Sequence, residues 1–315
     1  MLPDEIMNQK TVAITGGTGS FGRFIARELL VSNVSQVIVF SRDEEKQLEM
    51  RREISDSRLK LVIGDVRDRE RVLESVRADY VYHAAALKII PTCEENPAEA
   101  YKTNLLGTLN VKEACIGNDV RKAILVSTDK AVKPVNTYGM TKALAEKLWL
   151  APPSSRPIFS TVRYGNVIGS RGSIVPLFKE LIKQGKPLPI TDPSMSRFLL
   201  TLEQATGLVF NATDKAIGGE VFVPKCPACK ITDLAEALAG KDYPIQNIGI
   251  RPGEKIAEVL ISEEEIRRTE DMGESYLIHP HGRFHKSSLK DEFSSETAPQ
   301  LRVSEIRSLL EEAGF

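Results

Sequence analysis

The sequence predicts an α/β protein of the Rossmann type, in which a doubly wound parallel sheet is followed by a smaller C-terminal substrate-binding lobe. Short apolar, β-branched runs alternate with helical segments through the first half of the chain. The first run, residues 11–15, leads into a glycine-rich turn and then a helix. After about Gly169 this rhythm breaks and proline becomes more frequent. We therefore expect a dinucleotide-binding domain over residues 1–168, joined by some later segments, and mainly a substrate-binding lobe with a C-terminal helix over residues 169–315.

The composition excludes several classes of protein. Of the 315 residues, 42% are hydrophobic and 27% are charged, which is typical of a soluble globular protein. The net charge of −1 argues against a nucleic-acid-binding surface. No apolar run is long enough to cross a membrane, residues 1–10 do not resemble a signal peptide, and four cysteines do not form a disulfide framework. We expect a cytoplasmic enzyme that binds neither nucleic acid nor membrane.

The glycine-rich turn after the first predicted strand is a candidate cofactor site. Gly16, Gly19 and Gly22 recur at intervals of three, immediately before a helix predicted over residues 23–30. Such a turn brings the backbone close to a pyrophosphate, and the helix N-terminus donates amides to its oxygens. A purely structural turn is the alternative, but the strand–turn–helix context favours a dinucleotide. The expected contacts are Gly16, Thr18, Gly19, Ser20, Phe21 and Gly22.

The end of the second predicted strand, residues 36–40, bears on the type of cofactor. NAD sites usually have an acidic residue here to hold the ribose hydroxyls, whereas an arginine accommodates the 2′-phosphate of NADP. Ser41 and Arg42 occupy this place and favour NADP over NAD. Asp43 follows directly, so a strand that ended one or two residues later would reverse the prediction.

The third and fourth predicted strands, residues 59–63 and 80–83, end in residues suited to the rest of a dinucleotide. Asp65 can accept a hydrogen bond from an adenine amine, or it can cap the following helix. Small side chains after the fourth strand let the backbone lie against the cofactor. The expected contacts are Asp65, Val66, Ala84, Ala85 and Ala86. Asn104, within a helix predicted over residues 96–115, is interpreted as structural.

Reactive residues follow the fifth predicted strand, residues 123–126. Thr128, Asp129 and Lys130 come at its carboxyl end, where open α/β sheets bind ligands. Tyr138 and Lys142 lie four residues apart, so on a helix they point the same way.

These residue types predict oxidation followed by elimination. The pKa of a phenol is about 10, and a neighbouring ammonium such as that of Lys142 lowers it. Tyr138 could then take a proton from a substrate hydroxyl while a hydride leaves the same carbon. An amine and a carboxylic acid, Lys130 and Asp129, suit removal of the α-proton of the new ketone and protonation of a departing oxygen. The alternative is a solvated Asp–Lys loop pair and a tyrosine that only packs.

The chain resembles the extended short-chain dehydrogenase/reductases. TGGTGSFG at residues 15–22 resembles their glycine motif, and Thr128 with Tyr138 and Lys142 resembles their catalytic set. The stretches HAAALK, STDKAVKPVNTYGMTK and RPGEK are further similar to the nucleotide-sugar 4,6-dehydratases of polysaccharide biosynthesis, above all the soluble, inverting UDP-N-acetylglucosamine 4,6-dehydratases. The matching stretches span nearly the whole chain.

The resemblance implies an NADP-dependent hydro-lyase. Tyr138, assisted by Lys142, would deprotonate the 4-hydroxyl, Lys130 would remove the C5 proton, and Asp129 would protonate the leaving 6-hydroxyl. The product would be a 4-keto-6-deoxy sugar nucleotide with C5 inverted, used in surface glycans of the nonulosonic acid type. The implied substrate contacts are Lys88, Asn166, Arg197, Arg251 and Glu254. A homo-oligomer is also expected.

Several alternatives stay open. Ile89 and Ile90 stand where the inverting enzymes have His-Val, so the nucleotide can be UDP or GDP and the C5 outcome is not fixed. A nucleotide-sugar 4-epimerase would need Tyr138 and Lys142 but not the Asp–Lys pair. A non-catalytic NADP-sensing scaffold would be expected to lack the Tyr or the Lys.

Two patterns invite a metal-site interpretation. Cys226 and Cys229 form a lone Cys-x-x-Cys pair, whereas structural zinc requires four ligands. His279, His281 and His285 cluster near a polar, serine-rich tail. Neither set is complete, so no metal is expected.

Overall fold

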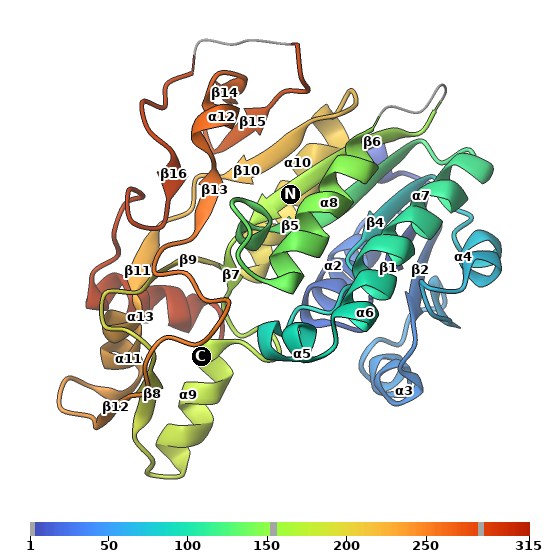
Figure 1. The fold of residues 1–315 in the computed structure, drawn as a ribbon. Helices are drawn as coiled ribbons and strands as arrows, with labels where there is room; N and C mark the ends of the chain where they lie inside the picture. Colours follow the sequence, from blue (N-terminus) through green and yellow to red (C-terminus); the bar gives the residue numbers. More distant parts are fainter. Residues whose placement is uncertain (1–3, 152–155, 283–286) are drawn as a thin grey trace.

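The computed structural model describes residues 4–151, 156–282 and 287–315 (Figure 1). Its central sheet has nine strands in the order β14-β15-β10-β6-β5-β4-β1-β2-β3 within the described chain. All neighbours run parallel except β15, which is antiparallel to both β10 and β14. The predicted Rossmann-type fold class is therefore confirmed. The strands are β1 (Thr11–Thr15), β2 (Gln36–Ser41), β3 (Leu59–Ile63), β4 (Tyr80–His83), β5 (Lys122–Thr128), β6 (Ile158–Tyr164), β10 (Val221–Pro224), β14 (Thr269–Asp271) and β15 (Ser275–Ile278).

Helices cover both faces of this sheet because its central strands are apolar on both sides. Ile14 and Ile124 face one core, which Ile25 and Val209 complete from the helices packed on that side. The opposite core includes Trp149, the largest fully buried side chain in the described chain. The first face carries α2 (Ser20–Val31), α3 (Glu44–Glu53) and α10 (Leu202–Lys215), and the second carries α4 (Arg69–Ser75), α7 (Gly107–Gly117) and α8 (Thr137–Leu150).

The helix predicted over residues 96–115 is divided into α6 (Pro97–Ala100), the π-helical η1 (Tyr101–Leu106) and α7. Asn104 lies in the π-helical turn. Its side chain accepts a hydrogen bond from the Leu87 amide (2.7 Å) and donates to the Leu87 carbonyl (2.9 Å) and to Thr141 Oγ1 (3.0 Å). Asn104 thus ties the loop after β4, which α5 (Ile90–Glu95) follows, to helix α8.

Much of the later chain forms a smaller lobe beside the carboxyl ends of the strands (Figure 1, lower left). Phe178, Met195 and Ile231 belong to its own hydrophobic core. Strands β10, β14 and β15 instead belong to the large sheet, and helix α10 packs against that sheet. The remaining elements are α1 (Asp4–Met7), η2 (Asp129–Ala131), β7 (Asn166–Val167), α9 (Ile174–Lys183), β8 (Leu188–Ile190), β9 (Ser196–Leu200), β11 (Ala228–Lys230), α11 (Ile231–Ala239), β12 (Ile245–Asn247), β13 (Val259–Ile261), α12 (Glu263–Ile266), β16 (Phe293–Ser294) and α13 (Val303–Glu312).

Candidate active site

A pocket of about 630 Å³ lies at the carboxyl ends of β1, β4, β5 and β6 and extends under the smaller lobe. This is the edge at which a parallel sheet binds ligands. Most of the residues predicted as site residues line it: Gly16, Gly19, Ser20, Phe21, Gly22, Ala84, Ala85, Ala86, Lys88, Thr128, Lys130, Tyr138, Lys142, Asn166, Arg197, Arg251 and Glu254. Thr18, Ser41, Arg42, Asp65, Val66 and Asp129 do not line it. The individual roles of these residues stay predictions.

The glycine turn forms a close cradle with the segment after β4. Gly16 has a positive φ of 68°, and a Cβ built on it would lie 2.7 Å from Ala85 Cα. A residue larger than glycine would therefore collide with the backbone at Ala84 and Ala85. The structure explains the glycine as a requirement for close backbone approach in front of α2, which begins at Ser20.

Asp43, which follows the end of β2, is engaged in contacts with the next helix. The strand ends at Ser41, and Asp43 caps α3 by accepting a hydrogen bond from the Lys46 amide (2.9 Å). Its carboxylate also pairs with the Lys46 ammonium, and these hydrogen bonds lower the pKa of Asp43. The Arg42 side chain is half exposed, with Nη1 3.5 Å from Asp65 Oδ2.

Asp65 is held by a second arginine. Arg67 donates its backbone amide to Asp65 Oδ1 (3.0 Å) and its guanidinium to Oδ2 (2.6 Å). Asp68, rather than Asp65, caps α4 by accepting from the Arg71 amide (3.0 Å). The helix-capping alternative for Asp65 is therefore wrong.

The reactive cluster is positioned by the end of β5 and the start of α8. Asn136 caps α8 through Oδ1, which accepts from the Gly139 amide (2.7 Å). Gly139 packs so closely on η2 that a Cβ would lie 2.2 Å from the Lys130 carbonyl oxygen. The absent side chain lets α8 bring Tyr138 and Lys142 to the pocket beside Lys130.

The electrostatics of Tyr138 and Lys142 differ from the sequence-based expectation. Burial raises the pKa of Tyr138 to about 12, and the opposing influences come from the Lys130 ammonium and the Thr128 hydroxyl. Burial also lowers the pKa of Lys142 to about 8, although Glu146 opposes this shift. Lys142 Nζ donates to the Val126 carbonyl at 2.8 Å. The predicted lowering of the Tyr138 pKa is therefore wrong here, because removal of the phenol from water outweighs the favourable effects of the Lys130 ammonium and the Thr128 hydroxyl.

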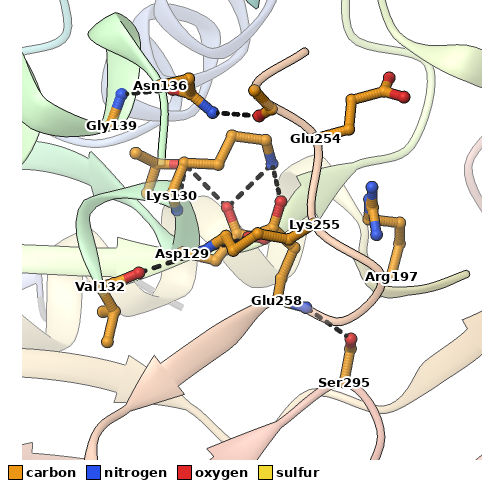
Figure 2. Close-up of polar contacts among 12 residues, drawn as sticks. Asp129, Lys130, Val132, Asn136, Gly139, Arg197, Glu254, Lys255, Glu258 and Ser295 are labelled. Carbon is orange, nitrogen blue, oxygen red and sulfur yellow. Dashed lines mark hydrogen bonds and ion pairs between the residues drawn. The ribbon is translucent and has the colours of Figure 1, made fainter. Parts of the chain in front are cut away.

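Lys130 lies between two carboxylates (Figure 2). Its Nζ is 3.0 Å from Asp129 Oδ1 and 3.4 Å from Glu258 Oε1. Burial lowers the pKa of Lys130, but Asp129 and Glu258 together outweigh it and leave the pKa above its ordinary value. The structure therefore favours an ammonium at this position.

Asp129 is fully buried and only partly satisfied. Its Oδ1 accepts from Thr128 Oγ1 (2.8 Å) and from Lys130 Nζ (3.0 Å). Within the described residues its Oδ2 has no hydrogen-bond partner. This oxygen lies at Gly165, where an added Cβ would be 3.3 Å away. A buried carboxylate oxygen without a partner is costly and is typical of a functional site.

Glu258 and Lys255 are the members of this cluster that sequence reasoning missed. Glu258 follows the RPGEK stretch of residues 251–255, and its side chain is 3% exposed. Its Oε2 is 2.8 Å from Lys255 Nζ. Burial raises the pKa of Glu258, but Lys130, Lys255 and Arg197 reverse this and hold it below the usual range. One signal was available, namely a charged residue close after a motif already assigned to the site.

The predicted substrate contacts come from several elements of the pocket wall. Arg197, on β9, donates to the carbonyls of Ser196 (2.7 Å) and Ile256 (3.1 Å). Arg251 Nε donates to Glu254 Oε1 (2.9 Å), and the Arg251 amide donates to Oε2 (3.2 Å). Glu254 thus orients Arg251 at the pocket wall. Burial, and then Lys130, lower the pKa of Lys88.

The residues of each pattern considered for metal binding have separate surroundings in the structure. Cys226 and Cys229 are buried thiols that belong to different hydrophobic clusters. His279 Nε2 is 2.8 Å from Glu270 Oε2, and His285 lies outside the described residues. No group of three or more His, Cys, Asp or Glu in the described ranges could hold a metal ion.

Comparisons with known proteins identify the family. Residues 12–280 match the family model described as polysaccharide biosynthesis protein. The chain belongs to this family. It is 46% identical over 325 residues to a protein named UDP-glucose 4-epimerase from Rickettsia canadensis (strain McKiel), covering 96% of this chain and 95% of the relative. It is also 46% identical over 286 residues to the UDP-N-acetylglucosamine 4,6-dehydratase (inverting) of Campylobacter jejuni subsp. jejuni serotype O:2, covering 89% and 85%.

Solved structures show the same fold. Pen from Bacillus thuringiensis superimposes with a TM-score of 0.91 at 37% identity, covering 98% of this chain and 99% of that one. The Thermus thermophilus UDP-glucose 4-epimerase in complex with NAD gives a TM-score of 0.66 at 25% identity, covering 78% and 88%. The expected likeness to the polysaccharide-biosynthesis dehydratases is confirmed, while the names of the relatives divide between epimerase and dehydratase. In the part of the chain described, no helix is long and apolar enough to span a membrane.

Proposed function

We propose that this protein is an NADP-dependent 4,6-dehydratase of a nucleotide-activated N-acetylhexosamine, with UDP-N-acetylglucosamine as the first candidate substrate. The observation that carries the proposal is the contact between Asp129 and Lys130 beside Tyr138. It offers an acid and an amine at the place where a sugar would be oxidised. Elimination of water requires both groups, whereas simple oxidation and reduction require neither.

A nicotinamide dinucleotide fits the cradle formed by Gly16 and the backbone at Ala84 and Ala85, which a side chain at residue 16 would fill. Gly16, Gly19 and Ser20 would hold its pyrophosphate at the start of α2. When bound, this cofactor would supply the oxidising power for C4 of the sugar and the reducing power for C6. Arg42 supports the choice of NADP, because its guanidinium is half exposed while Asp43 is engaged in capping α3.

Tyr138 would accept the proton of the 4-hydroxyl during the oxidation. Because a pKa of about 12 leaves Tyr138 as a phenol near neutral pH, it must first give its own proton to solvent, and nearby positive charge would stabilise the phenolate that then accepts the 4-hydroxyl proton. The Lys130 ammonium favours this phenolate, and Lys142 lines the same pocket. The 4-ketone that results acidifies the hydrogen at C5.

One proton transfer prepares the Asp129–Lys130 pair for elimination. Moving a proton from Lys130 Nζ to Asp129 Oδ1, across 3.0 Å, converts an ammonium and a carboxylate into an amine and a carboxylic acid. The amine then takes the C5 proton, and the acid gives its proton to the 6-hydroxyl, which leaves as water. After hydride return to C6, a proton from solvent added to C5 on the opposite face gives the inverted 4-keto-6-deoxy sugar.

The lobe supplies cations suited to a diphosphate. Arg197 and Arg251 both line the pocket, and Glu254 fixes the orientation of Arg251. A guanidinium can bind phosphate oxygens in a bidentate manner. These groups suit UDP and GDP sugars equally, so the experiment below compares substrates with both nucleobases.

The second candidate function is nucleotide-sugar 4-epimerisation. It is favoured by the Rickettsia relatives named UDP-glucose 4-epimerase, one of which is 46% identical. Tyr138 and Lys142 would serve that reaction, but it gives the buried Asp129–Lys130 pair no role.

The mass of the product distinguishes the two functions. Purified protein with NADP is incubated separately with UDP-N-acetylglucosamine, GDP-N-acetylglucosamine and UDP-glucose. We expect loss of one water from an N-acetylhexosamine nucleotide. A product of unchanged mass and altered configuration would support the epimerase, and absence of reaction with all three would contradict both.

A further inference from the structure

The segment of residues 251–258 is fastened to the reactive loop of residues 129–136 at three points (Figure 2). Asn136 Nδ2 donates to the Gly253 carbonyl at 2.7 Å, and Lys255 Nζ donates to the Val132 carbonyl at 3.0 Å. The third contact joins Glu258 Oε1 to Lys130 Nζ at 3.4 Å. Only this third contact involves a residue with a proposed chemical role.

Glu258 is held firmly by its surroundings. Its backbone amide donates to Ser295 Oγ (2.9 Å), and its carbonyl accepts from the Ser295 amide (2.8 Å). Its second carboxylate oxygen lies 2.8 Å from Lys255 Nζ. Glu258 Oε2 makes this ion pair without a hydrogen bond of good geometry among the described residues, so the backbone contacts and the burial of the side chain, which is 3% exposed, are what make it a rigid reference point.

Lys130 needs such a reference point. A lysine side chain has four rotatable bonds, and fixing them costs up to about 2 kcal/mol of conformational entropy. Asp129 is adjacent in sequence and by itself restricts the ammonium on one side only. Glu258 approaches from a distant part of the chain and restricts it on another.

We propose that Glu258 is a positioning residue that holds the Lys130 nitrogen beside Asp129, in register with C5 of the bound sugar. The inference rests on the proposed dehydration. Glu258 acts through Lys130 and takes no part in the oxidation at C4. The segment of residues 251–258 begins with Arg251, which is proposed to bind the diphosphate of the substrate. The segment therefore connects Arg251 to the Asp129–Lys130 pair.

The test separates oxidation from elimination in a single turnover. The Glu258→Met variant has a side chain of similar length without carboxylate oxygens. Reduced nicotinamide absorbance reports hydride transfer from C4, and product mass reports loss of water. We expect hydride transfer to stay within about threefold of the parent while elimination falls about 100-fold, the effect of a misplacement near 1 Å. Reduced cofactor should therefore accumulate, with KM for the sugar nucleotide little changed.

Two further variants secure the interpretation. Glu258→Gln keeps one acceptor oxygen for two lysines, so we expect a loss of elimination on the order of tenfold, the value of one hydrogen bond to a charged group. If Glu258→Met does not fold, Glu258→Gln alone tests the positioning role. Glu263→Gln is the matched control, because it removes an exposed ion pair with Lys133 of the same reactive loop and should leave both steps unchanged.

The possible results have distinct meanings. If the parent protein releases no water from any sugar nucleotide, the proposed function fails. If the parent dehydrates its substrate and the Glu258 variants slow both steps equally, or neither, the positioning role is wrong.

Discussion

Replacing Gly139 by alanine tests whether the close packing of α8 on η2 sets the position of the reactive groups. An added Cβ would lie 2.2 Å from the Lys130 carbonyl oxygen, whereas real contacts of this kind are essentially never below 3.0 Å. The helix and the loop must therefore separate by roughly 0.8 Å, and a displacement near 1 Å can reduce a rate about 100-fold.

Stability should change much less than activity. Alanine gains about 1 kcal/mol of helix propensity over glycine, while overpacking costs about 1–3 kcal/mol, so the two effects largely offset each other. We expect kcat to fall about 100-fold with a net destabilisation of at most about 2 kcal/mol. The assay is sugar-nucleotide turnover together with chemical denaturation of the same preparation.

Gly207→Ala is the matched control. Gly207 also lies inside a helix, α10, but apart from its chain neighbours and the backbone of its own helix no described atom lies within 4 Å of an added Cβ. This variant should be slightly stabilised and fully active. Turnover by Gly139→Ala at the parental rate would refute the argument that this contact positions Lys130 and Tyr138.

Two further predictions concern the cofactor and pH. Arg42→Ala should raise KM for NADP about 10- to 100-fold, the value of a hydrogen bond to a charged group, and should leave KM for NAD nearly unchanged; equal effects on both cofactors would contradict the assignment of Arg42 to the 2′-phosphate. The Lys142 ammonium should be lost as pH rises through its pKa of about 8, so single-turnover hydride transfer should be fast below this pH and slow above it. A hydride-transfer rate that keeps rising above this pH would show that the charged form of Lys142 is not required.

Much of the fold could be predicted because local patterns and tertiary structure agree. The apolar runs at residues 11–15 and 36–40 became β1 and β2, and the glycines between strand and helix lie where backbone segments meet. The spacing of Tyr138 and Lys142 placed both on the pocket side of α8 for the same reason. The π-helical turn at Asn104 could not be anticipated, since its hydrogen bonds depend on Leu87 and Thr141 from other segments.

The pKa shifts in the site were less predictable from the sequence than the identity of the residues that form it. The proximity of Lys142 to Tyr138 predicted a lowered phenol pKa, but burial raises it to about 12, and sequence spacing does not report burial depth. Glu258 was missed for a related reason: it reaches Lys130 across 128 residues of sequence through a fold-dependent contact. The Asp129–Lys130 pair was visible because the two residues are adjacent.

The most direct measurement is the NMR spectrum of the product formed from UDP-N-acetylglucosamine in deuterated water by the parent protein and by Lys130→Met. With the parent, we expect a 4-keto-6-deoxy sugar that carries solvent deuterium at C5 in the inverted configuration. With Lys130→Met, which retains Tyr138 and Lys142, C5 should keep its original hydrogen and no water should be lost. Dehydration and deuterium incorporation by Lys130→Met at the parental rate would contradict the central role given to the Asp129–Lys130 pair.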